Sequence, residues 1–226
     1  TTLSFLVDEL YKKPEEIKMI YFSKSFLIIS ILLNGSISQA ETPEQHALDA
    51  VPKNYEKVLT YEAEFIQKSY IKMMDKTQDV KGTVIIKKPG KMKWSYGAPD
   101  TQILISDGST LWLYVPDEEQ ATKVPIESIY SSNTPALFLA GKGKLMQTFN
   151  VESVNLDKDP IRITLTPKAD DQALTRLQLF ADKKNYQITG STVYDKLGNK
   201  TEIRFSNIKT NREIPEKTFQ FQAPTN

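Results

Sequence analysis

Side chains with catalytic potential are few in this sequence and lie apart from one another. The 226-residue chain has no cysteine and one histidine, His46. The lack of cysteine excludes disulfides, thiolate metal sites and cysteine nucleophiles. His46 has no serine motif or carboxylate at ligand spacing beside it, so a solvated position near a helix start is the favoured interpretation.

The acidic and glycine-rich stretches give no better case for catalysis. Asp117-Glu118-Glu119 and Asp170-Asp171 fall in predicted turns, whereas an acid–base pair needs burial to separate its pKa values. "GKGK" at 141–144 lacks the frame of a phosphate-binding loop, and metalloprotease and hydrolase motifs are absent from the sequence. We therefore predict no catalytic residue, no metal site and no cofactor. A hydrolase with an unrecognised site is the weaker alternative.

A local basic patch comprises Lys87, Lys88, Lys91 and Lys93. Such a cluster is typical of a solvated sheet edge that blocks strand-on-strand association, and docking to an acidic partner surface is the alternative. The net charge of the whole chain is +1, which gives no indication of nucleic-acid binding.

The N-terminal region predicts export. Residues 19–40 have the pattern of a signal peptide, with Lys24, an apolar run at 26–33 and a Ser38-Gln39-Ala40 cleavage site. A membrane anchor is the alternative, but the run is far shorter than the ~20 residues that cross a bilayer. We expect residues 1–18 to be an upstream extension, cleavage after Ala40, and one domain over 41–226 in the periplasm.

Hydrophobic periodicity predicts a mainly β domain with a few helices. Leu48, Val51, Tyr55, Val58 and Leu59 form one helix face, with Pro52 at a first turn or a kink. Alternation of period two then predicts strands near 63–67, 83–87, 91–96, 119–124, 149–155, 161–167, 174–181, 186–194 and 199–208. Helices are predicted from Asn133 or Thr134 to Gly141, and from Lys144 to Thr148. So many short antiparallel strands indicate one large curled sheet, with two or three helices over its concave face.

The stretch 91–116 contains both tryptophans and is apolar on two faces. A tight type I′ turn at Asp107-Gly108 would pair Leu104 with Leu111 on one face, and Ile103 with Trp112 on the other. A sheet with one solvated face does not have this pattern. Either helices and curvature bury both sides, or the concave side is an apolar cavity under a helical lid.

Several ordered motifs carry a family resemblance. They are Phe65-x-Gln67, Pro89…Trp94-x-Tyr96-x-x-Pro99, Ser106-Asp107-Gly108…Leu111-Trp112-x-Tyr114, Gln120-x-Thr122, Asn133-Thr134-Pro135 and "LTPK" at 165–168. In this order, over 44–222, the sequence resembles the outer-membrane lipoprotein carrier protein (LolA) family. The resemblance implies a half-open antiparallel β-barrel, its apolar cavity covered by two or three α-helices.

The resemblance also implies a function. Such a carrier is a monomer that binds lipoprotein acyl chains, receives them from an inner-membrane ABC-type transporter and delivers them to an outer-membrane receptor. A lipid- or peptide-sensing periplasmic module of the same fold is the alternative.

The resemblance assigns roles to five residues. Met92 and Trp94 would contact acyl chains, with Leu137 and Leu139 approaching from the lid; ordinary core packing is the alternative for Met92 and Trp94. Lys88 stands where the family usually has an arginine that holds the lid shut, and we expect it near 137–141. Lysine offers a point charge in place of a planar fork, so closure is expected to be weaker or differently partnered. Lys91 and Lys93 are expected to stay solvated on the opposite face.

Overall fold

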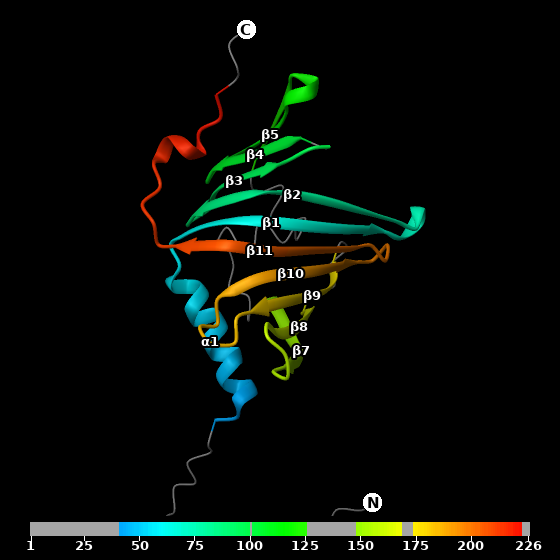
Figure 1. Cartoon of the computed structure of the whole chain (residues 1–226), viewed down its shortest axis with the longest axis vertical. Coiled ribbons are helices and arrows are strands. Elements are labelled where there is room, and N and C mark those ends of the chain that lie inside the picture. The colour runs from blue at the N-terminus through cyan, green and yellow to red at the C-terminus, as the bar shows by residue number, and fades with distance from the viewer. Residues whose placement is uncertain (1–40, 100, 126–147, 169–173, 223–226) are drawn as a thin grey trace, which may run out of the picture. The chain divides into compact units, whose positions relative to one another are not determined.

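Eleven antiparallel strands form one sheet in the order β6-β5-β4-β3-β2-β1-β11-β10-β9-β8-β7 (Figure 1). The computed structural model describes residues 41–99, 101–125, 148–168 and 174–222, all of them within one compact unit, Ala40–Asn226. The edge strands β6 and β7 are not paired with each other, so the described sheet does not close into a barrel. The predicted mainly β, half-open antiparallel fold is confirmed.

Most strands lie close to the predicted ranges, but the first two are 12 residues long where only 63–67 and 83–87 were predicted. They are β1 (Thr60–Ile71), β2 (Lys76–Lys87), β3 (Lys91–Tyr96), β4 (Gln102–Asp107), β5 (Thr110–Val115), β6 (Gln120–Pro125), β7 (Phe149–Asn155), β8 (Ile161–Pro167), β9 (Leu174–Ala181), β10 (Ile188–Asp195) and β11 (Lys200–Thr210). Short 3-10 turns occur at η1 (Lys72–Met74), η2 (Pro116–Glu118) and η3 (Glu216–Phe219). The helices predicted at 133–141 and 144–148 lie outside the described residues, apart from Thr148.

Helix α1 (Pro43–Lys57) begins earlier and ends sooner than its apolar pattern predicts. Thr42 caps it by accepting a hydrogen bond from the Gln45 amide. Pro43 occupies the first turn, where a backbone N–H would have no acceptor within the helix, so the missing N–H of proline costs nothing. Pro52 therefore lies inside the helix. Val58 is the C-cap and Leu59 is 63% exposed, so assigning Leu59 to the buried helix face was wrong.

The core lies between α1 and one face of the sheet, here called the inner face. Ala47 and Val51 of α1 belong to the same buried cluster as the inner-face side chains of eight strands. The β1–β2 and β1–β11 registers place Phe65 opposite both Gly82 and Phe205. Aromatic and aliphatic side chains from strands distant in sequence thus share one continuous apolar layer.

The β4–β5 hairpin has the predicted faces but a different register. Leu104 pairs with Leu113, and Ile105 pairs with Trp112, so the expected pairs were displaced by two residues. The turn is wider than a type I′ turn because the Asp107 carboxylate accepts hydrogen bonds from the amides of Ser109 and Thr110. Because the displacement is even, every side chain keeps its predicted face.

The C-terminal segment 214–222 covers the opposite face of β3–β5, here called the outer face. Phe221 stacks on Trp112 with ring centroids 4.9 Å apart, and Phe219 is buried. Lys87 donates to one Glu216 carboxylate oxygen at 2.6 Å, and Lys91 forms an ion pair with the other. This segment explains the second apolar face of 91–116. It also corrects the expectation that Lys91 is merely solvated, because Lys91 holds the segment in place.

Glu216 predicts a pH dependence of this attachment. Hydrogen bonds from Lys87 and Lys91 lower the pKa of Glu216 to about 2. Because the folded pKa lies below the ordinary value, the stabilisation is complete above about pH 4.5 and is lost as pH falls toward about 2. We expect the protection of the amides at 214–221, measured by hydrogen-exchange mass spectrometry and corrected for the intrinsic exchange rate, to fall over this range in the wild type. Glu216→Gln should exchange faster at neutral pH and lose that dependence, whereas identical profiles for the two proteins would contradict the assignment.

Candidate functional site

Met92 and Trp94 lie side by side along β3 on the inner face. Met92 is 1% exposed and Trp94 is fully buried. Met92 lies between Ile86 of β2 and Ser106 of β4 in the strand register, and Trp94 lies between Val84 and Leu104. Both belong to the buried cluster, as the core interpretation predicted.

Trp94 is the centre of an aromatic group on the inner face. Its ring meets Phe65 edge-on at 5.1 Å, stacks on Tyr96 at 6.4 Å and lies 6.2 Å from Phe205. The indole Nε1 is buried and has no hydrogen-bond partner among the described residues. An unpaired buried donor is unfavourable, so this N–H is a polar point to which an acceptor on a bound molecule can add a hydrogen bond.

Lys88 joins the sheet to the C-terminal end of α1. Its backbone amide donates to the carbonyl of Leu59 at 2.8 Å, and its Nζ donates to the carbonyl of Tyr55. The same Nζ lies 3.3 Å from the centroid of the Tyr55 ring, which adds a cation–π contact. Among the described residues, Lys88 therefore contacts α1. The contact expected with 137–141, like Leu137 and Leu139 themselves, lies outside the described residues.

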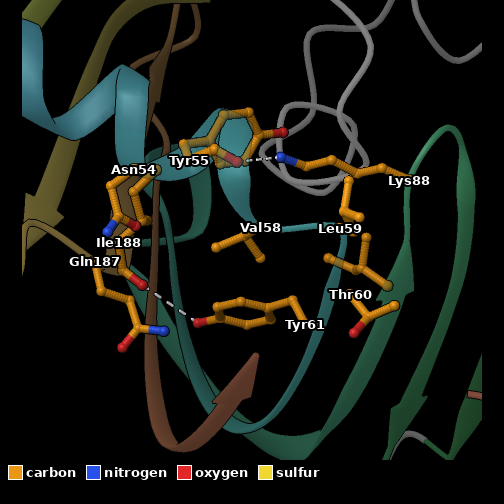
Figure 2. A pocket seen from close by; sticks show the side chains of 10 residues that line it. Asn54, Tyr55, Val58, Leu59, Thr60, Tyr61, Lys88, Gln187 and Ile188 are labelled. Carbon is orange, nitrogen blue, oxygen red and sulfur yellow. Dashed lines mark hydrogen bonds between the residues drawn. The ribbon is translucent and has the colours of Figure 1, made fainter. Parts of the chain in front are cut away.

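A pocket lies beneath this contact. The space between its lining atoms, counted with the open solvent at its mouth, is about 360 Å³. Figure 2 shows Lys88 reaching Tyr55 across its rim while Val58 and Tyr61 line its interior. The Tyr61 hydroxyl donates to the carbonyl of Ile188 at 3.3 Å. The complete lining is Asn54, Tyr55, Val58, Leu59, Thr60, Tyr61, Ile86, Lys88, Gln187 and Ile188.

Electrostatics in this pocket are set by burial. Desolvation lowers the pKa of Lys88 to about 8, with Glu56 opposing part of that shift, and burial raises the pKa of Tyr61. For Lys88 the folded pKa lies below the ordinary value, so its buried charge costs stability below about pH 8 and this cost disappears as pH rises toward 10.5. Above about pH 8 the ammonium also loses the charge that strengthens its contact with Tyr55.

Sequence reasoning found Lys88 but missed most of the pocket around it. Tyr55 was assigned to the apolar face of a helix, and the sequence pattern gave no reason to place Gln187 and Ile188 opposite that helix. They meet α1 because the β9–β10 connection returns beside its last turn, where the Asn54 side chain donates to the carbonyl of Asn185 at 3.0 Å. No local pattern encodes that contact.

His46 lies at the other end of α1, where a more open pocket separates the first turn from Leu156, Ile161, Lys183 and Tyr186; its space, counted with open solvent, is about 720 Å³. Its side chain is 56% exposed, lies 3.7 Å from Glu41 and meets the Tyr186 ring edge-on at 5.4 Å. The predicted solvated position near a helix start is confirmed.

Two kinds of feature are absent from the described ranges. Within these ranges, no three His, Cys, Asp or Glu side chains gather closely enough to hold a metal ion. In the same part of the chain, no helix has the length and apolar character needed to cross a bilayer.

Known proteins are similar to this chain over most of its length. The family model described as outer membrane lipoprotein carrier protein LolA matches residues 56–222. An outer-membrane lipoprotein carrier protein from Chromohalobacter salexigens is 34% identical, with 83% of this chain and 86% of the relative aligned. Another from Hahella chejuensis is 34% identical over 85% of this chain and 90% of the relative.

One solved structure supports the fold only. An uncharacterized conserved protein from Thermus thermophilus is 11% identical, covers 79% of this chain and 93% of its own, and has a TM-score of 0.50. The sequence matches carry the family assignment, because one spans nearly three quarters of the chain and the others exceed 30% identity over most of it. The chain belongs to the LolA family of outer membrane lipoprotein carrier proteins.

Proposed function

We propose that this protein is a periplasmic carrier that binds lipoprotein acyl chains against its inner face. It would receive them from an inner-membrane ABC-type transporter and deliver them, as a monomer, to an outer-membrane receptor. The observation that carries the proposal is the continuous apolar inner face, closed at one end by the Lys88–Tyr55 contact. The family assignment supports the same role.

Energetics favour a closable apolar site. Each methylene removed from water contributes ~0.8 kcal/mol, so three long acyl chains represent on the order of 30 kcal/mol as an upper bound. A carrier that recovered all of this could not release its cargo. Breaking the Lys88–Tyr55 contact on loading offsets part of the free energy gained by acyl burial. Re-forming this contact on release favours the empty protein.

In this proposal Met92 and Trp94 form the floor of the acyl site, and Leu137 and Leu139 cover it. Met92 is flexible and polarizable, which suits irregular contacts with lipid. The unpaired Trp94 N–H is a donor for an ester carbonyl of the cargo. No chemical step is required, so the protein acts by binding and release and not as an enzyme.

The decisive experiment identifies what the protein carries. The protein is purified from a periplasmic extract and its bound material is analysed by mass spectrometry. Co-purified lipoprotein with an acylated N-terminus is the expected result, together with a carrier that begins at Glu41. Free phospholipid or peptide in its place would support the sensing module, and an intact 19–40 segment would contradict a freely diffusing carrier.

Replacing Lys88 tests closure of the site. Lys88→Leu removes a charged hydrogen bond and a cation–π contact, worth about 1–2 kcal/mol at this half-buried position. The closing equilibrium should therefore fall about fivefold to thirtyfold. We expect loading to persist and transfer to the receptor to slow by a similar factor, measured with donor membranes and purified receptor.

Two matched variants make this test specific. Lys88→Arg retains the positive charge and adds a planar fork of donors, so it should transfer at least as fast as the wild type. Lys93→Leu removes a lysine from the outer side of β3 and should have no effect on transfer. Normal transfer by Lys88→Leu would make Lys88 an ordinary surface residue.

A further inference from the structure

Two hairpin ends lie side by side at the end of the sheet away from Lys88. The β1–β2 connection and the β10–β11 connection project together, as Figure 1 shows at the far ends of these strands. The Lys72 amide donates to the Asn199 side-chain oxygen at 3.0 Å and links them. Gly198 permits this approach, because its φ is +83° and a Cβ there would lie 2.4 Å from the Lys72 side chain.

Large apolar side chains are exposed where these hairpins meet. Met73 is 93% exposed, Leu197 is 78% exposed and Met74 is 61% exposed. These three are half of the six large apolar side chains that are exposed in the described residues. We call residues 72–76 and 195–200 together the tip surface. Single exposed apolar residues are ordinary, but three clustered on adjoining hairpins indicate an interaction site.

The tip surface is held in shape by its own hydrogen bonds. Tyr70 donates to the Asp75 carboxylate at 2.9 Å. Asn199 donates to both carboxylate oxygens of Asp195, at 2.8 Å from its backbone N–H and at 2.7 Å from its side-chain amide. The apolar side chains are therefore presented by folded turns, so little conformational entropy is lost when they bind.

The charge of the tip surface is positive. It contains four lysines and two aspartates, a formal charge of +2. Both aspartates are engaged in the hydrogen bonds described above, while Lys72, Lys76 and Lys196 are exposed. Long lysine side chains can keep their ammonium groups at an interface while apolar neighbours enter it.

We propose that the tip surface docks the protein on an anionic lipid surface. Met73, Met74 and Leu197 enter the interfacial layer of the bilayer, and the surrounding lysines contact lipid phosphates. The apolar side chains project outward, which suits insertion into a soft interface. Three side chains and a charge of +2 form a weak, reversible contact, as a protein that must leave one membrane for another requires.

This docking would orient the molecule. The tip surface includes the start of β2 and Lys88 follows its end, so the 12 residues of β2 hold them about 40 Å apart. The pocket beneath Lys88 would face away from the lipid surface. Docking therefore differs from acyl uptake, and its test does not depend on the proposed carrier function.

A single label at the tip surface tests the contact directly. The chain has no cysteine, so Met73→Cys carries one environment-sensitive fluorophore, and Val151→Cys on β7, an exposed apolar position outside the tip surface, provides a control. Labelled proteins that begin at Glu41, without the apolar segment at 26–33, are titrated with phosphatidylglycerol or phosphatidylcholine vesicles. We expect a blue shift at position 73 and none at 151. Apparent affinity should be about tenfold higher for phosphatidylglycerol, and this preference should fall at about 0.5 M salt.

Variants then test whether the tip surface binds lipid or a protein partner. Met74→Ser combined with Leu197→Ser should lower the apparent vesicle affinity, read from the blue shift at position 73, about tenfold. Lys72→Glu with Lys76→Glu should abolish the preference for phosphatidylglycerol. Circular dichroism confirms that each variant folds. No shift at position 73 with either lipid, or a shift unchanged by these substitutions, would overturn the proposal. The remaining outcome is that the wild type does not bind vesicles, while the Met74→Ser/Leu197→Ser variant loses binding to the purified transporter. In that case the tip surface would bind a protein partner and the lipid proposal would be overturned.

Discussion

Met92→Glu is expected to unfold the domain rather than merely weaken acyl binding. Met92 is 1% exposed and packs within the buried cluster between β2 and β4. An uncompensated charge in such a position costs about 3–5 kcal/mol, a large share of a typical domain's stability. Urea unfolding followed by circular dichroism should show a large loss of midpoint or no cooperative transition.

Met92→Leu is the matched control because it conserves volume and introduces no charge. It should cost less than about 1.5 kcal/mol and leave the fold intact, so it can test acyl contact separately from stability. Slower loading by a folded Met92→Leu protein would support the acyl site over Met92. A stable, folded Met92→Glu protein would instead mean that this face opens to water.

Gly82→Ala is expected to be as damaging, although it adds only one methyl group. A Cβ at Gly82 would lie 2.1 Å from the Ser95 carbonyl oxygen and 2.6 Å from the Phe65 ring. The carbonyl belongs to β3, beside Gly82 in the sheet, and Phe65 is held by Trp94 and Tyr96. Relief requires separation of β2 from β3, so we expect a loss of about 3 kcal/mol or more in the free energy of unfolding.

Gly97→Ala provides the comparison, since it makes the same substitution just beyond β3. There the nearest atom to a new Cβ is the Lys81 carbonyl oxygen at 3.3 Å, which a small backbone shift relieves. We expect a change within about 1 kcal/mol, measured by the same unfolding titration. Equal stabilities for the two alanine variants would show that the close approach at Gly82 is not a packing constraint.

The closed contact between Lys88 and α1 and the exposed tip surface occupy opposite ends of β2. The first is half-buried beside a pocket, whereas the second is solvated and projects from the sheet. Variants at one end should therefore leave the other unchanged. A loss of vesicle docking in Lys88→Leu would indicate that opening of α1 reaches the hairpin ends through β2.

Local properties of the sequence were sufficient for the strands and their faces. Period-two alternation fixes which side of the sheet a residue occupies, and it placed Leu104 and Leu111 on one face and Ile103 and Trp112 on the other. It did not fix their register, because the Asp107 carboxylate widens the turn by binding the amides that follow it. The start of α1 was likewise missed, since the Thr42 cap and Pro43 act before its apolar pattern begins.

Contacts between distant segments were decided only in the folded structure. The second apolar face of 91–116 is covered by residues about a hundred positions later, through Phe221 on Trp112 and Glu216 on Lys91. Lys88 meets the Tyr55 carbonyl, and Lys72 meets Asn199, across similarly unrelated stretches. Side-chain type and spacing indicate whether a residue can be buried and which hydrogen bonds or ion pairs it can form. Which partner it meets depends on how strand order, register and turns bring separate segments together, and no local pattern contains that information.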